Sequence, residues 1–253
     1  MKEDFQVANL LVARDDTGML CQLHRLVFIA GITGLIALAV WPYHDGALRY
    51  GFPLAFLAAW SAGLWHLRRR KYWRLVLLVL PVLAAVPFIL PEKPIDPETL
   101  RTRYVAAMEQ MEGSRYVWGG ESHQGIDCSG LPRRALRDAL WETGMKNGNG
   151  EAFRKWAEQW WFDTSAKALG QNYRGFTRPV GISGKLCDLD CDRLMPGDLA
   201  VTADGRHVLV YLREGKWIQA DPMASKVIIG HGRRDQIAWF NSLVTMHRWM
   251  VLE

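Results

Sequence analysis

The sequence contains little cysteine and no repetitive segment. Only four cysteines occur among its 253 residues, which is too few for the dense disulfide framework that holds small secreted domains together. There is no internal repeat, no low-complexity tract and no glycine loop of the kind that binds phosphate. These absences exclude a repeat architecture and leave a nucleotide-binding site without support.

The sequence also lacks a basic surface pattern suited to nucleic acid. The net charge of +5 comes largely from one cluster, at Arg68, Arg69, Arg70, Lys71 and Arg74. No basic stripe is interleaved with aromatic residues that would stack on bases. We therefore expect no nucleic-acid partner.

Three apolar runs without any charged residue occupy the first part of the chain, at residues 26–41, 51–65 and 75–90. As a helix, such a run spans roughly 24 Å. Aromatic residues at the run ends extend this length toward the roughly 30 Å hydrocarbon core of a bilayer. We predict three transmembrane helices within residues 26–91, in contact with a lipid bilayer. The second run is the least secure of the three, because Ser61 and Gly63 lie inside it.

Basic residues around these runs predict their orientation. The basic cluster lies between the second and third runs, whereas Arg49 is the only basic residue between the first and second. Since cytoplasmic loops carry the excess of lysine and arginine, we place the cluster and residues 1–25 in the cytoplasm. Three crossings then put a linker, 92–96, and a second domain, 97–253, on the outer side. A removable signal peptide is not expected, because no small-residue cleavage site follows the first run.

Two glycine-containing motifs lie close together in the second domain, and the second of them contains a cysteine. YVWGG begins at Tyr116, and DCSGL begins at Asp127. Apolar residues recur at helical spacing over 131–141 and predict a helix directly after the second motif, with Pro132 in its first turn. The positive end of this helix is expected to lower the pKa of the Cys128 thiol. Cys128 is therefore a candidate nucleophile, and the plainer alternative is a buried structural thiol.

A histidine on a predicted hairpin is the candidate base. Asp-Gly at 204–205 is a strong hairpin turn, and His207 lies on the returning strand. The following strand, 216–220, leads to Gln219 and Asp221 on one face. Either residue is placed to orient the imidazole by a hydrogen bond. We assign this role to Gln219, with Asp221 as the alternative, because Pro222 is expected to end the strand.

The motifs resemble those of a known family. Together with PGDL from Pro196, HVLVY from His207 and WIQA from Trp217, they follow the order found in the NlpC/P60 cysteine peptidases of bacterial cell walls. The resemblance covers about residues 97–253. It implies an α+β, papain-like domain in which helices pack on a small antiparallel sheet.

The resemblance also implies roles for single residues and a reaction. It gives the catalytic residues as Cys128, His207 and Gln219, and the substrate-binding residues as Tyr116, Asp127 and Ser129. Ser129 and Asp127 would hold the free amine end of the substrate. The reaction would be hydrolysis of the bond between D-glutamate and a diamino acid in peptidoglycan stem peptides or muropeptides. No metal and no organic cofactor is implied. The expected location is the bacterial inner membrane, with the catalytic domain on the periplasmic or extracellular side.

Several features depart from the family pattern. Gln219 is uncharged, so it cannot stabilise an imidazolium as a carboxylate would. Pro132 stands where members usually carry an apolar residue with a backbone donor. Residues 141–170 lengthen the chain between Cys128 and His207 and contain several tryptophans, for which packing is the favoured role and a lid the alternative. Two other function classes stay open: an amidase or acyl transferase that uses the same pair, and a catalytically silent wall-binding module.

Cys187 and Cys191 are spaced for a short disulfide. The expected topology places them in an oxidising space, and they approach bonding distance if residues 185–192 form one helical turn. A metal pair is the alternative, but C-x-x-x-C without a second ligand pair is weak evidence for zinc. We predict no metal site.

Overall fold

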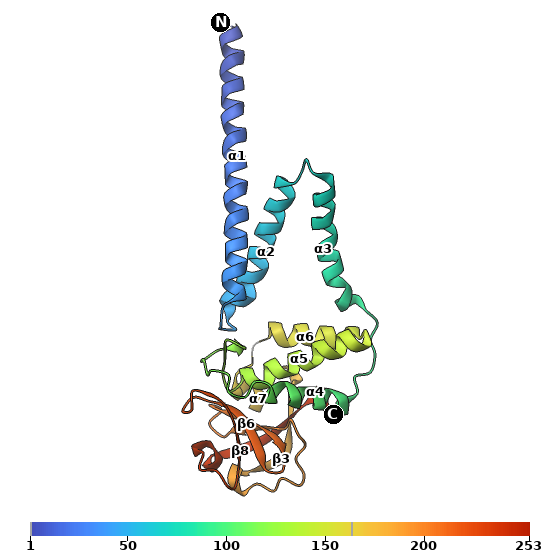
Figure 1. Ribbon diagram of the computed structural model, residues 1–253, viewed down its shortest axis with the longest axis vertical. Helices are drawn as coiled ribbons and strands as arrows, with labels where there is room; N and C mark the ends of the chain where they lie inside the picture. The colour runs from blue at the N-terminus through green and yellow to red at the C-terminus, as the bar shows by residue number, and fades with distance from the viewer. Residues whose placement is uncertain (1, 163) are drawn as a thin grey trace. The chain divides into compact units, whose positions relative to one another are not determined.

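The computed structural model describes residues 2–162 and 164–253, with side chains described from residue 19 onward (Figure 1). The chain divides into two compact units. The helical unit comprises Met1–Trp41 and Gly46–Ala85, and the globular unit comprises Pro42–Asp45 and Val86–Glu253. The segment 92–96, which was expected to be a linker, therefore lies inside the globular unit.

The helical unit contains α1 (Lys2–Ala39), α2 (Gly46–His66) and most of α3 (Lys71–Ile89). Among the described residues, two segments are long and apolar enough to cross a membrane, Met19–Ala39 and Lys71–Ile89. The expectation of three such helices is therefore corrected to two by length and composition. Within α2, Arg49, Pro53 and Ser61 interrupt the apolar sequence and lower its mean hydropathy.

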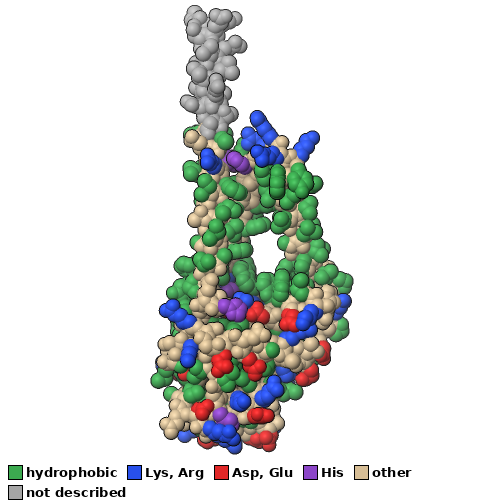
Figure 2. All heavy atoms as spheres, in the orientation of Figure 1, with side chains coloured by type: hydrophobic (Ala, Val, Ile, Leu, Met, Phe, Trp, Pro, Cys, Tyr) green, Lys and Arg blue, Asp and Glu red, His purple; other side chains and the backbone are tan. Residues whose placement is uncertain are grey.

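Close packing joins α1 and α2 within the helical unit. A Cβ atom added to Gly31 would lie 2.7 Å from the backbone nitrogen of Ala59, so the two helices touch through small residues. The indole Nε1 of Trp60 donates a hydrogen bond of 2.8 Å to the carbonyl oxygen of Leu77 in α3. In the view of Figure 2, hydrophobic side chains are exposed along the helices from residue 19 onward, and Lys and Arg side chains gather at the turn between α2 and α3.

The globular unit begins with helices whose ends the sequence marks clearly. Asp96 caps α4 (Pro97–Glu109) by accepting a hydrogen bond of 2.9 Å from the backbone N–H of Thr99. The next helix, α5 (Gly130–Asn147), contains Pro132 in its first turn, where a missing N–H costs little. Residues 141–170, which we call the insert, contain α6 (Gly150–Trp161), capped by Asn149, and the short α7 (Ala166–Gly170).

Six antiparallel strands form the main sheet, in the order β3-β8-β4-β5-β6-β7. Their bounds are β3 (Thr177–Lys185), β4 (Leu199–Thr202), β5 (Val208–Arg213), β6 (Lys216–Asp221), β7 (Lys226–His231) and β8 (Leu243–Trp249). A separate two-stranded sheet, β1 (Glu121–Ser122) with β2 (Gly125–Ile126), precedes α5. As expected, β6 ends at Asp221, immediately before Pro222. This arrangement confirms the α+β class with helices and an antiparallel sheet.

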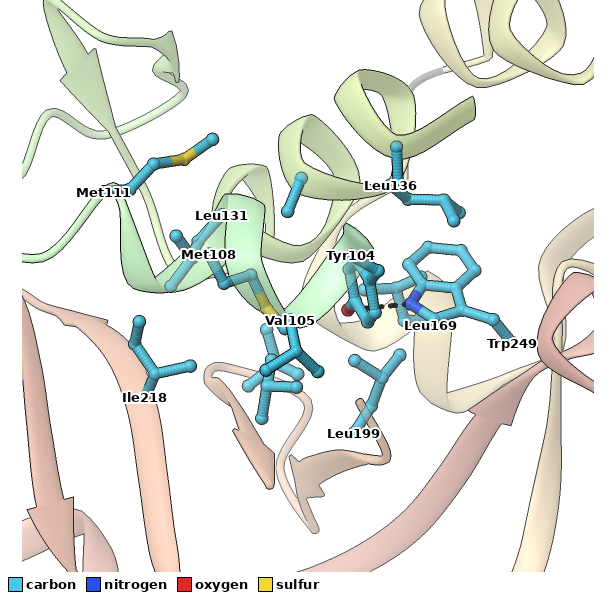
Figure 3. Packing of buried hydrophobic residues seen from close by; sticks show 14 of the residues in the cluster. Tyr104, Val105, Met108, Met111, Leu131, Leu136, Leu169, Leu199, Ile218 and Trp249 are labelled. Atoms are coloured by element: carbon cyan, nitrogen blue, oxygen red, sulfur yellow. Dashed lines mark hydrogen bonds between the residues drawn. The ribbon is translucent and has the colours of Figure 1, made fainter. Parts of the chain in front are cut away.

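Alternation along the strands gives the sheet two buried faces. Val208 and Val210 pack in the cluster that contains α4 and α5, whereas Leu209 and Tyr211 pack in a second cluster on the other face. In the first cluster the indole Nε1 of Trp249 donates a hydrogen bond of 3.0 Å to the hydroxyl of Tyr104, among apolar side chains of both layers (Figure 3). The hydrogen bond joins the sheet to α4, and Leu131 and Leu136 of α5 pack in the same cluster.

The expected disulfide is not present in the structure, in which Cys187 and Cys191 are free thiols. The backbone explains the difference. Only Leu186–Asp188 forms a 3-10 turn, and Leu189 is extended. The two cysteines are therefore not separated by the single helical turn on which the expectation depended.

Candidate active site

Cys128 lies at the junction between a tight turn and α5. The side chain of Asp127 builds this turn. Its Oδ1 atom accepts hydrogen bonds from the backbone N–H groups of Ser129 (3.0 Å) and Gly130 (2.6 Å). Its Oδ2 atom accepts a hydrogen bond of 2.8 Å from the N–H of Gly119. Gly130 must be glycine, because a Cβ atom there would collide with the carbonyl oxygen of Gly120.

The Cys128 thiol is protonated in this environment. The residue is only 7% exposed, and burial, followed by the negative charge of Asp127, raises the pKa of the thiol to about 12. The helix terminus was expected to lower this pKa, and that expectation is wrong because the loss of hydration outweighs the dipole. Attack by Cys128 therefore requires that a base removes the proton as the reaction proceeds.

His207 lies directly before β5 and is held on both its backbone and its side chain. Its backbone N–H donates a hydrogen bond of 3.0 Å to Oγ1 of Thr202. Its ring Nε2 is 2.6 Å from Oε1 of Gln219 on β6. Since an amide oxygen only accepts hydrogen bonds, Nε2 carries the proton and Nδ1 keeps the lone pair. Burial lowers the pKa of His207 to about 4, although the Gln219 hydrogen bond acts in the opposite direction. The ring is therefore neutral near pH 7 and able to accept a proton.

Trp239 is part of the site and was not predicted from the sequence. It comes from the 3-10 segment Ala238–Asn241. Its ring stacks on that of His207, with centroids 4.0 Å apart and an angle of 15° between the planes. Its Nε1 atom donates a hydrogen bond of 3.4 Å to Oδ1 of Asp221. Asp221, the alternative third residue, thus contacts the indole that packs on His207, while Gln219 accepts the hydrogen bond from the imidazole.

The three residues expected to bind substrate differ in how far their polar groups are already hydrogen-bonded within the protein. Tyr116 lines the cleft, and burial raises the pKa of its hydroxyl to about 12. Ser129 donates its hydroxyl to Oδ1 of Asp127 at 3.0 Å. The Asp127 carboxylate thus already accepts four hydrogen bonds from the protein, which is about its full capacity. Its geometry is that of a group that shapes the turn, and a role in holding the substrate amine stays a prediction.

One cleft of about 720 Å³ brings these groups together. Cys128 lines it from the turn before α5 and His207 from the residue before β5, with Trp239 also in the lining. Trp118, which is 76% exposed, lies at its edge. The remaining lining residues include three basic side chains, at Arg133, Lys167 and Arg206, and one histidine from outside the expected domain, His44.

A buried charged cluster lies beside the cleft and was also not predicted. Glu121 on β1 is 4% exposed. Its carboxylate pairs with Arg133 and Arg137 of α5, each at 3.2 Å, and with Nδ1 of His44 at 3.1 Å. Burial opposes ionisation of Glu121, but the two guanidinium groups outweigh it and lower the pKa of the carboxyl group. Glu121 is therefore a buried anion held by two guanidinium groups of α5, with the imidazole of His44 beside it.

Residues 113–244 match the family model described as the NlpC/P60 family, and this match covers slightly more than half of the chain. The chain belongs to the NlpC/P60 family. NlpC/P60 proteins are cysteine peptidases or amidases of peptidoglycan, so the family gives a chemical context for a neutral thiol and a neutral imidazole in one cleft. None of the curated proteins matches the chain significantly.

Several solved NlpC/P60 structures are similar to this chain. NlpC1 from Trichomonas vaginalis is 18% identical with a TM-score of 0.41, over 62% of this chain and 46% of that one. The P60 domain of an antigen from M. avium subspecies paratuberculosis is 18% identical with a TM-score of 0.39, over 62% and 98%. The peptidoglycan hydrolase RipB from Mycobacterium tuberculosis is 20% identical with a TM-score of 0.36, over 60% and 65%. The chain thus spans about half the length of the first of these proteins.

Proposed function

We propose that this protein is a membrane-anchored cysteine peptidase that hydrolyses stem peptides of peptidoglycan. One observation carries the proposal: Cys128 and His207 line the same cleft, and Gln219 fixes the imidazole in the tautomer that a base requires. Family membership supports the substrate class. The resemblance of the motifs supports the link between D-glutamate and a diamino acid as the bond that is cleaved.

The proposed reaction is acyl transfer in two steps. As Sγ of Cys128 attacks the peptide carbonyl carbon, Nδ1 of His207 takes the thiol proton, and a tetrahedral oxyanion forms. The backbone N–H of Cys128 and the hydroxyl of Tyr116 are the proposed donors to this oxyanion, because the N–H groups of Ser129 and Gly130 already donate to Asp127. His207 then gives its proton to the departing amine, leaving a thioester on Cys128. Water attacks the thioester with His207 as base, which releases the carboxylic acid and restores the thiol.

Membrane anchoring is the second part of the proposal, and it adds α2, which is not a candidate by length and composition, to the two candidate helices. The segment Pro42–Asp45 and the chain from Val86 onward both belong to the globular unit. They must therefore lie on the same side of a membrane, and the chain between them crosses it an even number of times. Since α3 is long and apolar enough to cross, α2 crosses as well. Its small-residue contact with α1 at Gly31 and Ala59 is typical of helices that pack inside a bilayer.

The basic cluster then sets the orientation of the catalytic domain. Arg68, Arg69 and Arg70 lie at the turn between α2 and α3, so one proposed crossing separates this turn from Asp45 and another separates it from the end of α3. By the positive-inside rule this turn is cytoplasmic. The globular unit is therefore proposed to face the periplasm or the cell exterior, where peptidoglycan is located.

The function is tested with the full chain in detergent micelles. Purified muropeptides are incubated with the protein, and the products are identified by mass spectrometry. We expect paired fragments that together contain one added water, with the new termini at the D-glutamyl carboxylate and the diamino-acid amine. Cys128→Ala should abolish the products, whereas Cys187→Ala, which removes a thiol outside the cleft, should leave them unchanged. Unchanged muropeptides with the wild-type protein, or equal activity in Cys128→Ala, would refute the proposal.

A further inference from the structure

The short segment between the first two helices is built into the globular unit. His44, which is 7% exposed, donates its backbone N–H to the carbonyl oxygen of Gly119 at 2.8 Å. Tyr43 forms an antiparallel bridge with Gly120. Pro42–Asp45 therefore pairs through its backbone with the segment that carries the YVWGG motif, although more than seventy residues separate the two segments in sequence.

The same stretch of chain touches the nucleophile turn on its other side. The N–H of Gly119 donates to Oδ2 of Asp127 at 2.8 Å, and the N–H of Asp127 donates to the carbonyl oxygen of Gly120 at 3.0 Å. Gly119 and Gly120 thus form a wall of the cleft, which we call the glycine wall. The turn of Cys128 is attached to one edge of the glycine wall, and His44 is attached to the other.

The side chain of His44 joins this wall to the charged cluster and to the insert. Its Nδ1 atom lies 3.1 Å from Oε2 of Glu121, the residue that follows the glycine wall. Its Nε2 atom lies 2.7 Å from the carbonyl oxygen of Trp160 near the end of α6. Arg133 donates to two further carbonyl oxygens there, those of Gln159 (2.8 Å) and Phe162 (3.1 Å). Cations at the carboxyl end of a helix complement its dipole.

These contacts explain how the buried charged groups are paired and how the ring of His44 is held in place. Two guanidinium groups face one carboxylate and the negative end of α6, so the buried charges are nearly balanced. Both ring nitrogens of His44 face oxygen atoms that accept hydrogen bonds. Burial, partly opposed by Glu121, lowers the pKa of His44. The imidazole is therefore locked between strand β1 and the insert rather than exposed to solvent.

We propose that the segment Pro42–Asp45 forms part of the active-site cleft. His44 is a positioning residue that holds the glycine wall in place through Glu121. This inference rests on the proposed function for its kinetic consequence. Without the His44 side chain, Glu121 and the carbonyl oxygen of Trp160 each lose a partner, and backbone contacts alone hold Pro42–Asp45 against the glycine wall. The turn of Cys128 is then less well placed against His207, and the cleft opens to water.

The experiment uses the full chain in detergent, with His44→Ala, the conservative His44→Gln and the control His123→Ala. His123 is exposed at the turn between β1 and β2 of the same unit. Turnover of muropeptide is measured per folded molecule, well below the unfolding temperature. We expect His44→Ala to lower kcat/KM at least tenfold, His44→Gln to recover part of this because an amide N–H still reaches Glu121, and His123→Ala to match wild type. Equal kcat and KM per folded molecule in His44→Ala would overturn the proposal.

A double-mutant cycle tests whether His44 acts through Glu121. If it does, the loss in His44→Ala with Glu121→Gln is clearly smaller than the product of the two single losses. Independent, multiplicative losses would contradict the proposed route. If His44→Ala does not fold, the cycle is made with His44→Gln.

A second measurement separates this inference from the proposed function. The rate at which iodoacetamide alkylates Cys128, followed by mass spectrometry, does not depend on any substrate. We expect the rate to increase several-fold in His44→Ala and to stay unchanged in His123→Ala, because the opened wall exposes the thiol. This result in a protein that cleaves no muropeptide would support the role of His44 and refute only the peptidase. Unchanged alkylation together with unchanged kinetics in an active enzyme would refute only the role of His44.

Discussion

The ring of His207 lies flat on the indole of Trp239, with the two centroids 4.0 Å apart. The stacked indole excludes water from one face of the imidazole, and burial is the main reason why the pKa of His207 is lowered to about 4. The base is active when neutral, so activity should fall only as the pH decreases through this low pKa. The contact thus keeps the base in its active form over a wide range of pH.

Trp239→Ala should narrow this range. Loss of the indole hydrates the imidazole, so the pKa of His207 should rise toward its ordinary value of about 6.5. The acidic limb of the profile of kcat/KM against pH should move upward by more than one pH unit, and kcat at pH 7 should fall. Trp239→Phe, which keeps an aromatic face, should shift the limb much less. An unchanged limb in Trp239→Ala would show that the indole does not set the pKa.

A graded series identifies the residue that orients His207. Gln219→Ala should lower turnover substantially, because the tautomer and the ring orientation are no longer fixed by the 2.6 Å hydrogen bond. Gln219→His should be tolerated, since an imidazole also accepts from Nε2. Asp221→Asn should stay within a few fold of wild type, because its contact is with Trp239. If Asp221→Asn is as damaging as His207→Ala while Gln219→Ala is mild, the orienting residue is Asp221.

The buried thiol should react slowly at neutral pH. Because burial raises the pKa of Cys128 to about 12, its alkylation rate should keep increasing with pH throughout the range from 6 to 10. The partly exposed Cys187 provides an internal control in the same digest. A rate for Cys128 that is high and constant above pH 6 would show a preformed thiolate and contradict this prediction. A slowly reacting thiol is thus not by itself a sign of a catalytically silent module.

Reporter fusions test the proposed orientation of the helices. A reporter that is active only outside the cytoplasm should be active when fused after Pro94 and silent when fused after Arg70. This follows from the parity of crossings between Asp45 and Val86, together with the basic turn. Activity at Arg70 would mean that α2 does not return the chain to the cytoplasm.

The buried pair of Asp198 and Arg248 should contribute strongly to stability. Asp198 is fully buried, and its two oxygen atoms accept hydrogen bonds of 2.6 and 2.7 Å from the guanidinium group. Asp198→Asn leaves the cation of Arg248 without its carboxylate, so the free energy of unfolding should fall by about 3 kcal/mol. Thermal unfolding of the full chain in detergent measures the loss. Asp192→Asn, at an exposed position, should unfold at the wild-type temperature.

Local signals predicted the elements that carry the proposed catalytic residues. The Asp-Gly turn at 204–205 and the proline at 222 fix the ends of the hairpin, because they act on their own backbone. Asp96 and Pro97 start α4 in the same way. These features depend on neighbours in sequence, and the structure places them where the sequence indicated.

Features that depend on distant parts of the chain were not predictable. Trp239 reaches His207 from a segment that carries no motif, and His44 reaches Glu121 from between α1 and α2. The pKa of Cys128 was misjudged because the sequence reveals the helix end but not the depth of burial. Cys187 and Cys191 have a suitable spacing, but the backbone between them leaves the helical path.

The globular unit is discontinuous in sequence, and this affects its synthesis. Pro42–Asp45 leaves the ribosome before α2 and α3, whereas the YVWGG and DCSGL motifs follow both. If Pro42–Asp45 forms part of the cleft and α2 and α3 cross the membrane as proposed, the cleft closes only after both helices have inserted and brought the two pieces to the same side. A chain that inserts in the wrong topology keeps them apart and lacks one edge of its active site. Correct insertion thus becomes a condition for hydrolytic activity, which restrains a wall-degrading enzyme until it has reached its place.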